Sequence, residues 1–249
     1  MREILGRRRM NRSSLRDAAL HCATRWEWPV LPGAPLGPPS SSARQSEQAP
    51  PAVCSCQDHG CVVPGAHPFD PVLLAATTDP RMVRWWWTKR PTAPLILATG
   101  GRAPSALSLP AIAGARALAE FDRRGERLGP VVATPTRFTL LVAPYALAEL
   151  GEQLYAHDWV PSSLRFHGEG GYVALPPSET GTGPARWERK PAAADEEVTG
   201  KAGRRAARRA ARRGGLTAGV PWLPQMRRVL DVLVEASATA PDTGTSLTY

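Results

Sequence analysis

The chain has 249 residues, a formal net charge of +9 and a pI near 10.1. This length suits one globular domain with tails or two small ones, and the basic excess favours a polyanionic partner such as nucleic acid. No apolar run reaches about eighteen residues, and none follows the basic N-terminus, so neither a transmembrane helix nor a secretory signal peptide is expected. We therefore predict a cytoplasmic protein without a membrane partner.

The N-terminal quarter begins with a basic leader, residues 1–13. The segment 14–25 predicts a short helix capped by serine, and "WPVLPG" predicts a brief strand. A proline- and serine-rich stretch follows, and then a cysteine-rich loop. Asp70 and Asp79 each precede a proline, which is the order typical of a helix N-cap and first residue, so two short helices are expected there.

Strands and helices alternate through the middle of the chain. Strands are predicted in "APLILAT", "ALSLP", "PVVATP" and "TRFTLLVAP", and helices in "AIAGARALAEFDRRG", which ends at Gly125, and in "YALAELGEQLYAH". "SLRFHGEGGYVALPP" predicts two short strands about a glycine turn. The alternation lacks a strict βαβ rhythm, which favours an α+β domain over residues 14–190, with a mixed sheet flanked by helices.

The C-terminal part changes character. Residues 191–220 form a basic low-complexity linker, residues 221–238 predict an amphipathic helix, and residues 239–249 predict a disordered tail. The linker includes an arginine run that, if helical, presents a guanidinium stripe suited to phosphates; the alternative is a solvated charge run. The run comprises Arg204, Arg205, Arg208, Arg209, Arg212 and Arg213.

The cysteine-rich loop, residues 54–67, has the spacing Cys54-x-Cys56-x4-Cys61-x5-His67. Three thiolates and one imidazole form a common closed site for structural zinc, so we predict a bound Zn²⁺. The alternative is a loop with unpaired or oxidised cysteines. His59 also lies in the loop and competes with His67 as the fourth ligand, whereas Cys22 is predicted to be a core residue.

Four segments occur in one order along the chain: "WPVLPG", "CSCQDHGCVVPGAHP", "WWWTKRPTAPLILATGG" and "HGEGGYVALPPSE". Together they resemble the N-terminal domain of bifunctional DNA primase/polymerases (prim-pol), of the archaeo-eukaryotic primase-like group and the actinobacterial type. The resemblance covers roughly residues 14–190. It implies a prim-pol fold and template-directed nucleotidyl transfer with two divalent ions.

The resemblance also implies where the catalytic groups belong. An acid-x-acid pair is expected on the strand after Thr99-Gly100, but Ser108 and Pro110 stand there. Phe138 stands nearest to the expected histidine. Glu169 is retained as an acid in the glycine-rich stretch, and His167 stands where an arginine is usual.

One carboxylate cannot hold two magnesium ions, so we predict a prim-pol fold that has lost polymerase chemistry and still binds DNA or nucleotides. The first alternative is an active enzyme whose Mg²⁺ or Mn²⁺ ligands come from Glu120, Asp122 or Glu126. The second alternative is a zinc-stabilised scaffold that binds other proteins.

The stretch around Glu169 is itself a candidate site for nucleotide phosphate, because consecutive glycines allow close approach of the backbone. The alternative is a tight hairpin. Its predicted contacts are His167, Gly168, Gly170, Gly171 and Tyr172. Trp85, Trp86 and Trp87 are expected to pack in the core, with base stacking as the alternative.

Overall fold

A computed structural model describes residues 2–37, 53–56, 58, 60–193 and 219–239, with the backbone alone for residues 2–13. The arginine run and residues 240–249 of the predicted tail lie outside the described residues. The helices are α1 (Arg2–Arg25), the 3₁₀ helix η2 (Leu73–Ala75), α2 (Pro80–Lys89), α3 (Ala111–Arg124), α4 (Leu147–Tyr155) and α6 (Met226–Ala238). The strands are β1 (Val30–Pro32), β2 (Leu95–Ala98), β3 (Ser105–Pro110), β4 (Val131–Ala133), β5 (Arg137–Val142), β6 (Arg165–His167), β7 (Tyr172–Leu175), β8 (Glu179–Thr180), β9 (Gly183–Pro184) and β10 (Arg186–Arg189).

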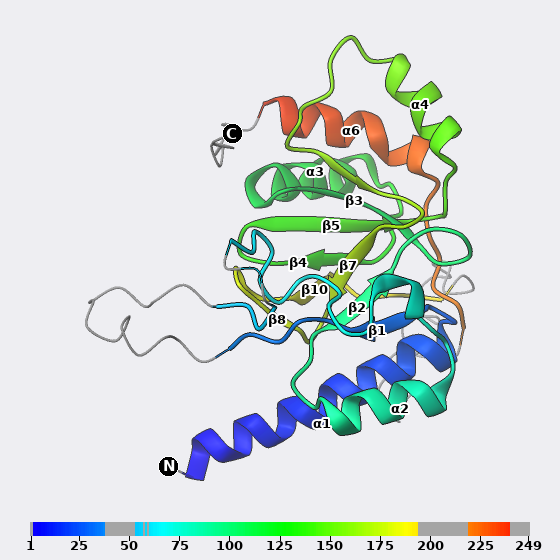
Figure 1. Ribbon diagram of the computed structural model, residues 1–249. Helices are drawn as coiled ribbons and strands as arrows, with labels where there is room; N and C mark the ends of the chain where they lie inside the picture. The colour runs from blue at the N-terminus through cyan, green and yellow to red at the C-terminus, as the bar shows by residue number, and fades with distance from the viewer. Residues whose placement is uncertain (1, 38–52, 57, 59, 194–218, 240–249) are drawn as a thin grey trace, which may run out of the picture.

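The described strands form two main sheets that are stacked between helices (Figure 1). The five-stranded sheet has the order β10-β4-β5-β3-β6, and the three-stranded sheet has the order β1-β2-β7. Helices α3 and α6 cover the outer face of the larger sheet, while α1 and α2 lie against the smaller one. The α+β class is therefore confirmed.

Strand direction departs from the expected mixed sheet, because every pairing among the described strands is antiparallel. The reason lies in the place of β5. Helix α3 returns the chain so that β4 runs parallel to β3, but β5 inserts between them and pairs with both. A crossover that would otherwise give a parallel pair thus gives two antiparallel pairs.

The glycine turn after β6 is not a hairpin. Strand β6 pairs with β3 in the larger sheet, whereas β7 pairs with β2 in the smaller one. Residues 168–171 therefore carry the chain from one sheet to the other. The local sequence pattern of two short strands about a turn is the same whether the strands pair with each other or join different sheets. Here the burial of β7 against β2 selects the second arrangement.

Two local predictions about helix starts are wrong. Helix α1 begins at Arg2 rather than after a serine cap, because its arginine-rich leader consists largely of good helix formers. Asp70 caps no helix; its carboxylate instead pairs with Arg90 at 2.6 Å. Asp79 does cap α2, accepting a hydrogen bond from the N–H of Arg81 at 2.8 Å, and Gly125 ends α3 with φ of 67°.

Two apolar clusters surround the larger sheet. One contains α1, α2 and the facing surfaces of both sheets, including Trp86 and Trp87, while Trp85 is 53 % exposed. The core interpretation is thus confirmed for two of the three tryptophans. The other cluster joins α3, α4 and α6 to the outer face of the larger sheet, so the predicted C-terminal helix is part of the core. No helix in the described ranges is long and apolar enough to cross a bilayer.

Candidate functional site

The predicted metal ligands converge. The Sγ atoms of Cys54, Cys56 and Cys61 and a ring nitrogen of His67 all lie within 4.8 Å of one another. His67 Nε2 is 3.2 Å from Cys54 Sγ and 3.4 Å from Cys61 Sγ. The described part of this loop thus brings together a Cys₃His group that could hold a metal ion.

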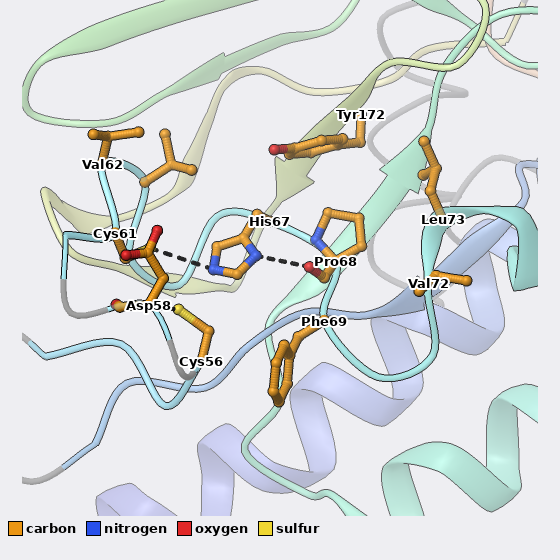
Figure 2. A pocket seen from close by; sticks show the side chains of 11 residues that line it. Cys56, Asp58, Cys61, Val62, His67, Pro68, Phe69, Val72, Leu73 and Tyr172 are labelled. Carbon is orange, nitrogen blue, oxygen red and sulfur yellow. Dashed lines mark hydrogen bonds between the residues drawn. The ribbon is translucent and has the colours of Figure 1, made fainter. Parts of the chain in front are cut away.

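The second ring nitrogen of His67 is also held in place. Nδ1 lies 2.7 Å from the carbonyl oxygen of Pro68, to which it donates its hydrogen, and this directs Nε2 toward the thiols (Figure 2). Metal-binding histidines are commonly oriented in this way by a carbonyl acceptor. His59, the competing ligand, lies outside the described residues, so the geometry supports His67 without testing His59.

The loop is fixed to both sides of the fold. The N–H of Ala34, just after β1, donates to the carbonyl of His67 at 3.0 Å, and the N–H of Gly181 donates to the carbonyl of Pro64 at 2.7 Å. Gly65 has φ of 70°, and a Cβ there would lie 2.8 Å from the carbonyl oxygen of Glu179. A glycine is therefore required for the loop to pass this close to β8.

The thiols of the cluster ionise unequally. Burial disfavours the thiolate of Cys54, but hydrogen bonds from the backbone of Cys56 and Gly65 and from His67 outweigh it and lower the pKa of Cys54 to about 6. Burial and the neighbouring thiols raise the pKa of Cys61 to about 11. Cys54 therefore forms a thiolate readily, and its negative charge disfavours a second thiolate at Cys61. This is expected of a group of thiols whose charges need a bound cation to neutralise them. Cys22 is 2 % exposed, and burial raises its pKa, so it is a core thiol as predicted.

A cavity of about 580 Å³ lies beside the cluster (Figure 2). Cys56, Cys61 and His67 form one side, and Phe69 and Tyr172 add aromatic rings. Tyr172 is the first residue of β7, directly after the glycine turn. This residue, predicted to contact nucleotide, therefore lines the cavity of the metal cluster.

Ser108 and Pro110 lie on one face of β3, because strand residues two apart point to the same side. They face the space between the two sheets, where a polar group not predicted from the sequence contacts them. Arg137 Nε donates to Ser108 Oγ at 2.8 Å, and Arg137 Nη2 donates to the carbonyls of Ser108 and Ser163 at 2.7 and 2.8 Å. A guanidinium thus covers the position expected to bear a carboxylate.

Phe138 does not join this group. It pairs with Leu109, so it lies on the opposite face of the sheet, where its ring packs against Gly114 of α3. A Cβ at Gly114 would lie 2.5 Å from Phe138 Cβ. The alternation of residues along "TRFTLLV" was the sequence signal that could have identified Arg137. Once the register is known, it places Arg137 and Thr139 on the face of Ser108.

Glu169 is exposed and lies in the glycine turn, four residues beyond Arg165, the residue that pairs with Ser108. Thr99 and Gly100 hold this turn. Thr99 Oγ1 donates to the carbonyl of Gly168 at 2.7 Å, and the N–H of Thr99 donates to the carbonyl of Gly171 at 2.9 Å. Glu169 is therefore joined to the Thr99-Gly100 segment, and it lies beyond His167, the last residue of β6 that pairs with β3.

His167 is half-buried on the face of Ser108, opposite Ala106. Burial and the nearby Arg137 and Arg165 lower its pKa to about 4 from the usual 6.5. The unfolded chain therefore takes up this proton first, and stability is lost as the pH falls from 6.5 toward 4.

We expect the variant His167→Gln to lose less stability than the wild type over that range, with a difference on the order of 2 kcal/mol at the acid end. Urea unfolding at several pH values measures it. Loss of a bound metal in acid affects both proteins alike, so only the difference between them reports on His167. Parallel stability curves would contradict the assignment.

A family model described as bifunctional DNA primase/polymerase, N-terminal, matches residues 19–200, most of the chain. The chain belongs to this prim-pol family. Neither the search of curated proteins nor that of solved structures gave a significant match. Membership in this family supports the expected link to nucleic acid. The matched region ends at residue 200, slightly beyond residue 190, where we predicted the end of the domain.

The acids of α3 and of the loop after it lie away from the polar face of β3 in this prim-pol domain. Glu120 is ten residues after Pro110, or roughly 15 Å along a helix at about 1.5 Å per residue. Its carboxylate pairs with Arg123 and Arg124 at 2.5 Å. Asp122 pairs with Arg189, and Glu126 lies 4.0 Å from Arg124. These acids are neutralised by arginines, which weighs against their holding catalytic metal ions.

Proposed function

We propose that this prim-pol domain binds DNA or nucleotides but no longer catalyses nucleotidyl transfer. One observation carries the proposal: Arg137 is hydrogen-bonded across Ser108, where the resemblance implies a metal-binding carboxylate. Nucleotidyl transfer with two divalent ions needs several anionic oxygen ligands close together. Serine and proline supply none, and the guanidinium repels a cation.

The Cys₃His cluster supports structural zinc. Its soft thiolates and single imidazole suit Zn²⁺ and not Mg²⁺, and its four ligands leave no open position for chemistry. Zinc held by Cys54, Cys56, Cys61 and His67 would tie the loop to β1 and β8. In this proposal Mg²⁺ or Mn²⁺ is not a cofactor of the domain, and the cytoplasm, where thiols stay reduced, is its proposed location.

A primer-extension assay on single-stranded template tests the loss of activity. Purified wild-type protein is expected to incorporate no nucleotide with either Mg²⁺ or Mn²⁺. Incorporation that Glu169→Ala abolishes would overturn the proposal and favour the active enzyme. A variant with Ser108→Asp, Pro110→Asp and Arg137→Thr is expected to gain Mn²⁺ binding, measured by electron paramagnetic resonance, because it restores two carboxylates and removes the cation above them.

We also propose that the arginine run at residues 204–213 contacts nucleic-acid phosphates. Deletion of residues 201–213 should weaken binding to duplex DNA and flatten the salt dependence, because each phosphate contact releases roughly 0.9 counterion. Fluorescence anisotropy across a salt series measures the slope of log K against log salt. An unchanged slope would identify the run as a solvated segment. Sequence preference should be unaffected, since phosphate contacts do not read bases.

A further inference from the structure

The face of the larger sheet that bears Ser108 has an excess of positive charge. Arg165 of β6 lies directly opposite Ser108 and therefore points to the same side, as does Arg137 of β5, opposite Pro110. Burial, and then the charge of Arg165, lower the pKa of Arg137 to about 10. A pKa near 10 still leaves Arg137 charged at neutral pH, and the charge of Arg165 lies close enough to repel it.

Within the described part of the chain, neither guanidinium is paired with a carboxylate. Arg137 donates only to the neutral oxygens of Ser108 and Ser163, and these bonds use Nε and Nη2. The two hydrogens on Nη1 are left available to a further acceptor. Other arginines of the fold are neutralised by acids, such as Arg189 by Asp122 and Arg90 by Asp70. Arg137 is partly buried and Arg165 is exposed, so a partly buried guanidinium lies beside a like charge without a counter-ion. This arrangement is unfavourable, and a bound anion would relieve it.

We propose that Arg137 and Arg165 bind the terminal phosphate of a nucleotide directly, without a divalent ion. The proposal rests on the proposed function, because it assigns the ligand of the same polar face. A terminal phosphate has a charge of about −1.5 to −2 at neutral pH, which two guanidiniums match. Arginine also presents paired N–H groups that suit phosphate oxygens. The half-buried hydroxyl of Thr139, opposite Ser108, is a third donor on this face.

This arrangement replaces metal cations by fixed cations. A site with two bound metal ions gains affinity for a nucleotide when Mg²⁺ is added. A guanidinium site instead competes with Mg²⁺ for the same phosphate oxygens. The response of affinity to added Mg²⁺ therefore distinguishes the two kinds of site, independently of any incorporation.

Isothermal titration of the full chain with a nucleoside 5′-triphosphate tests the proposal. The buffer is freed of divalent ions with a chelating resin before the protein is added, so that any zinc in the protein is not removed. Wild-type protein is expected to bind, and added Mg²⁺ is expected to leave the affinity unchanged or lower it. Arg165→Gln should raise Kd by roughly tenfold to a hundredfold, the effect of losing hydrogen bonds to a charged group.

Arg186→Gln is the matched control. Arg186 is an exposed arginine of the same sheet, but it pairs with Ala133 and so lies on the opposite face. The variant Arg186→Gln should therefore bind the triphosphate with the affinity of the wild type. Arg137→Lys keeps the charge but loses the paired donors, and it should also weaken binding; thermal melting checks that each variant is folded.

The phosphate could belong to a free nucleotide or to the 5′ end of a strand, and two oligonucleotides distinguish these sources. A 5′-phosphorylated oligonucleotide that binds Arg165-dependently, when its 5′-hydroxyl counterpart does not, would place a strand end at the site. The proposal is overturned if binding requires Mg²⁺, or if folded Arg165→Gln binds the triphosphate as tightly as the wild type. Either result leaves the loss of polymerase activity standing, because only incorporation by the wild type refutes that.

Discussion

Cys61→Ser is expected to abolish metal binding and to lower the free energy of unfolding by more than about 3 kcal/mol, the range reached when a point substitution removes metal coordination. The wild type, purified after zinc-replete expression, should contain one zinc ion per chain. Cys61 lies within the Cys₃His cluster that joins a loop to β1 and β8, so its loss releases contacts on both sides. Elemental analysis and urea unfolding measure the two effects.

Cys22→Ala is the control for the thiol itself. Cys22 is buried among the residues of the α1 core, away from the cluster, so this variant should lose some packing but keep its zinc. His67→Gln should lose the ion, whereas His59→Gln should retain it, because His67 Nε2 lies among the thiols. A metal content near zero in the wild type would refute the zinc assignment, and retention in His67→Gln with loss in His59→Gln would exchange the fourth ligand.

The substitution Gly100→Ala should be among the most damaging single changes in the chain. A Cβ at residue 100 would lie 2.3 Å from Glu169 Cα and 2.5 Å from Glu169 N, and φ is 86°. Backbone atoms cannot move aside as a flexible side chain can, so the turn that links β6 to β7 would separate from Thr99-Gly100. We expect a loss of more than about 3 kcal/mol in the free energy of unfolding, from overpacking added to backbone strain.

Gly101→Ala provides the comparison at the next residue. Gly101 also has a positive φ, 62°, but a Cβ there would have no neighbour within 4 Å. It should therefore lose only about 1–2 kcal/mol, the strain of a left-handed backbone. Thermal or urea unfolding of the two variants separates the steric term from the strain. Equal effects would show that the close contact with Glu169 is unimportant.

Local signals in the sequence predict much of the secondary structure. Asp79 before Pro80 and Gly125 after α3 are each sufficient to place a helix end, because capping depends on neighbouring residues alone. The cysteine spacing likewise predicts the metal cluster, since its four ligands lie in one short loop. Asp70 failed as a cap because a distant partner, Arg90, pairs with its carboxylate.

The polar face of β3 could not be predicted in the same way. Which residues share a face depends on the register of β5 and β6 against β3, and the three strands are far apart in sequence. Without that register, the sequence offers Phe138 for the position of the expected histidine and gives no reason to select Arg137, although it is the adjacent residue. The crossing from β6 to β7 was missed for a related reason, because a glycine turn has the same composition whether or not its strands pair.

The pairing of β2 with β7 also determines the order in which the chain can fold as it is synthesised. Strand β2 reaches residue 98, but its partner begins at Tyr172, so the smaller sheet stays open until more than seventy further residues have left the ribosome. The cysteine loop contacts β8 through Gly181, which is made later still. The thiols therefore emerge long before the surfaces that enclose them, and the nascent domain has access to a metal ion before its fold closes.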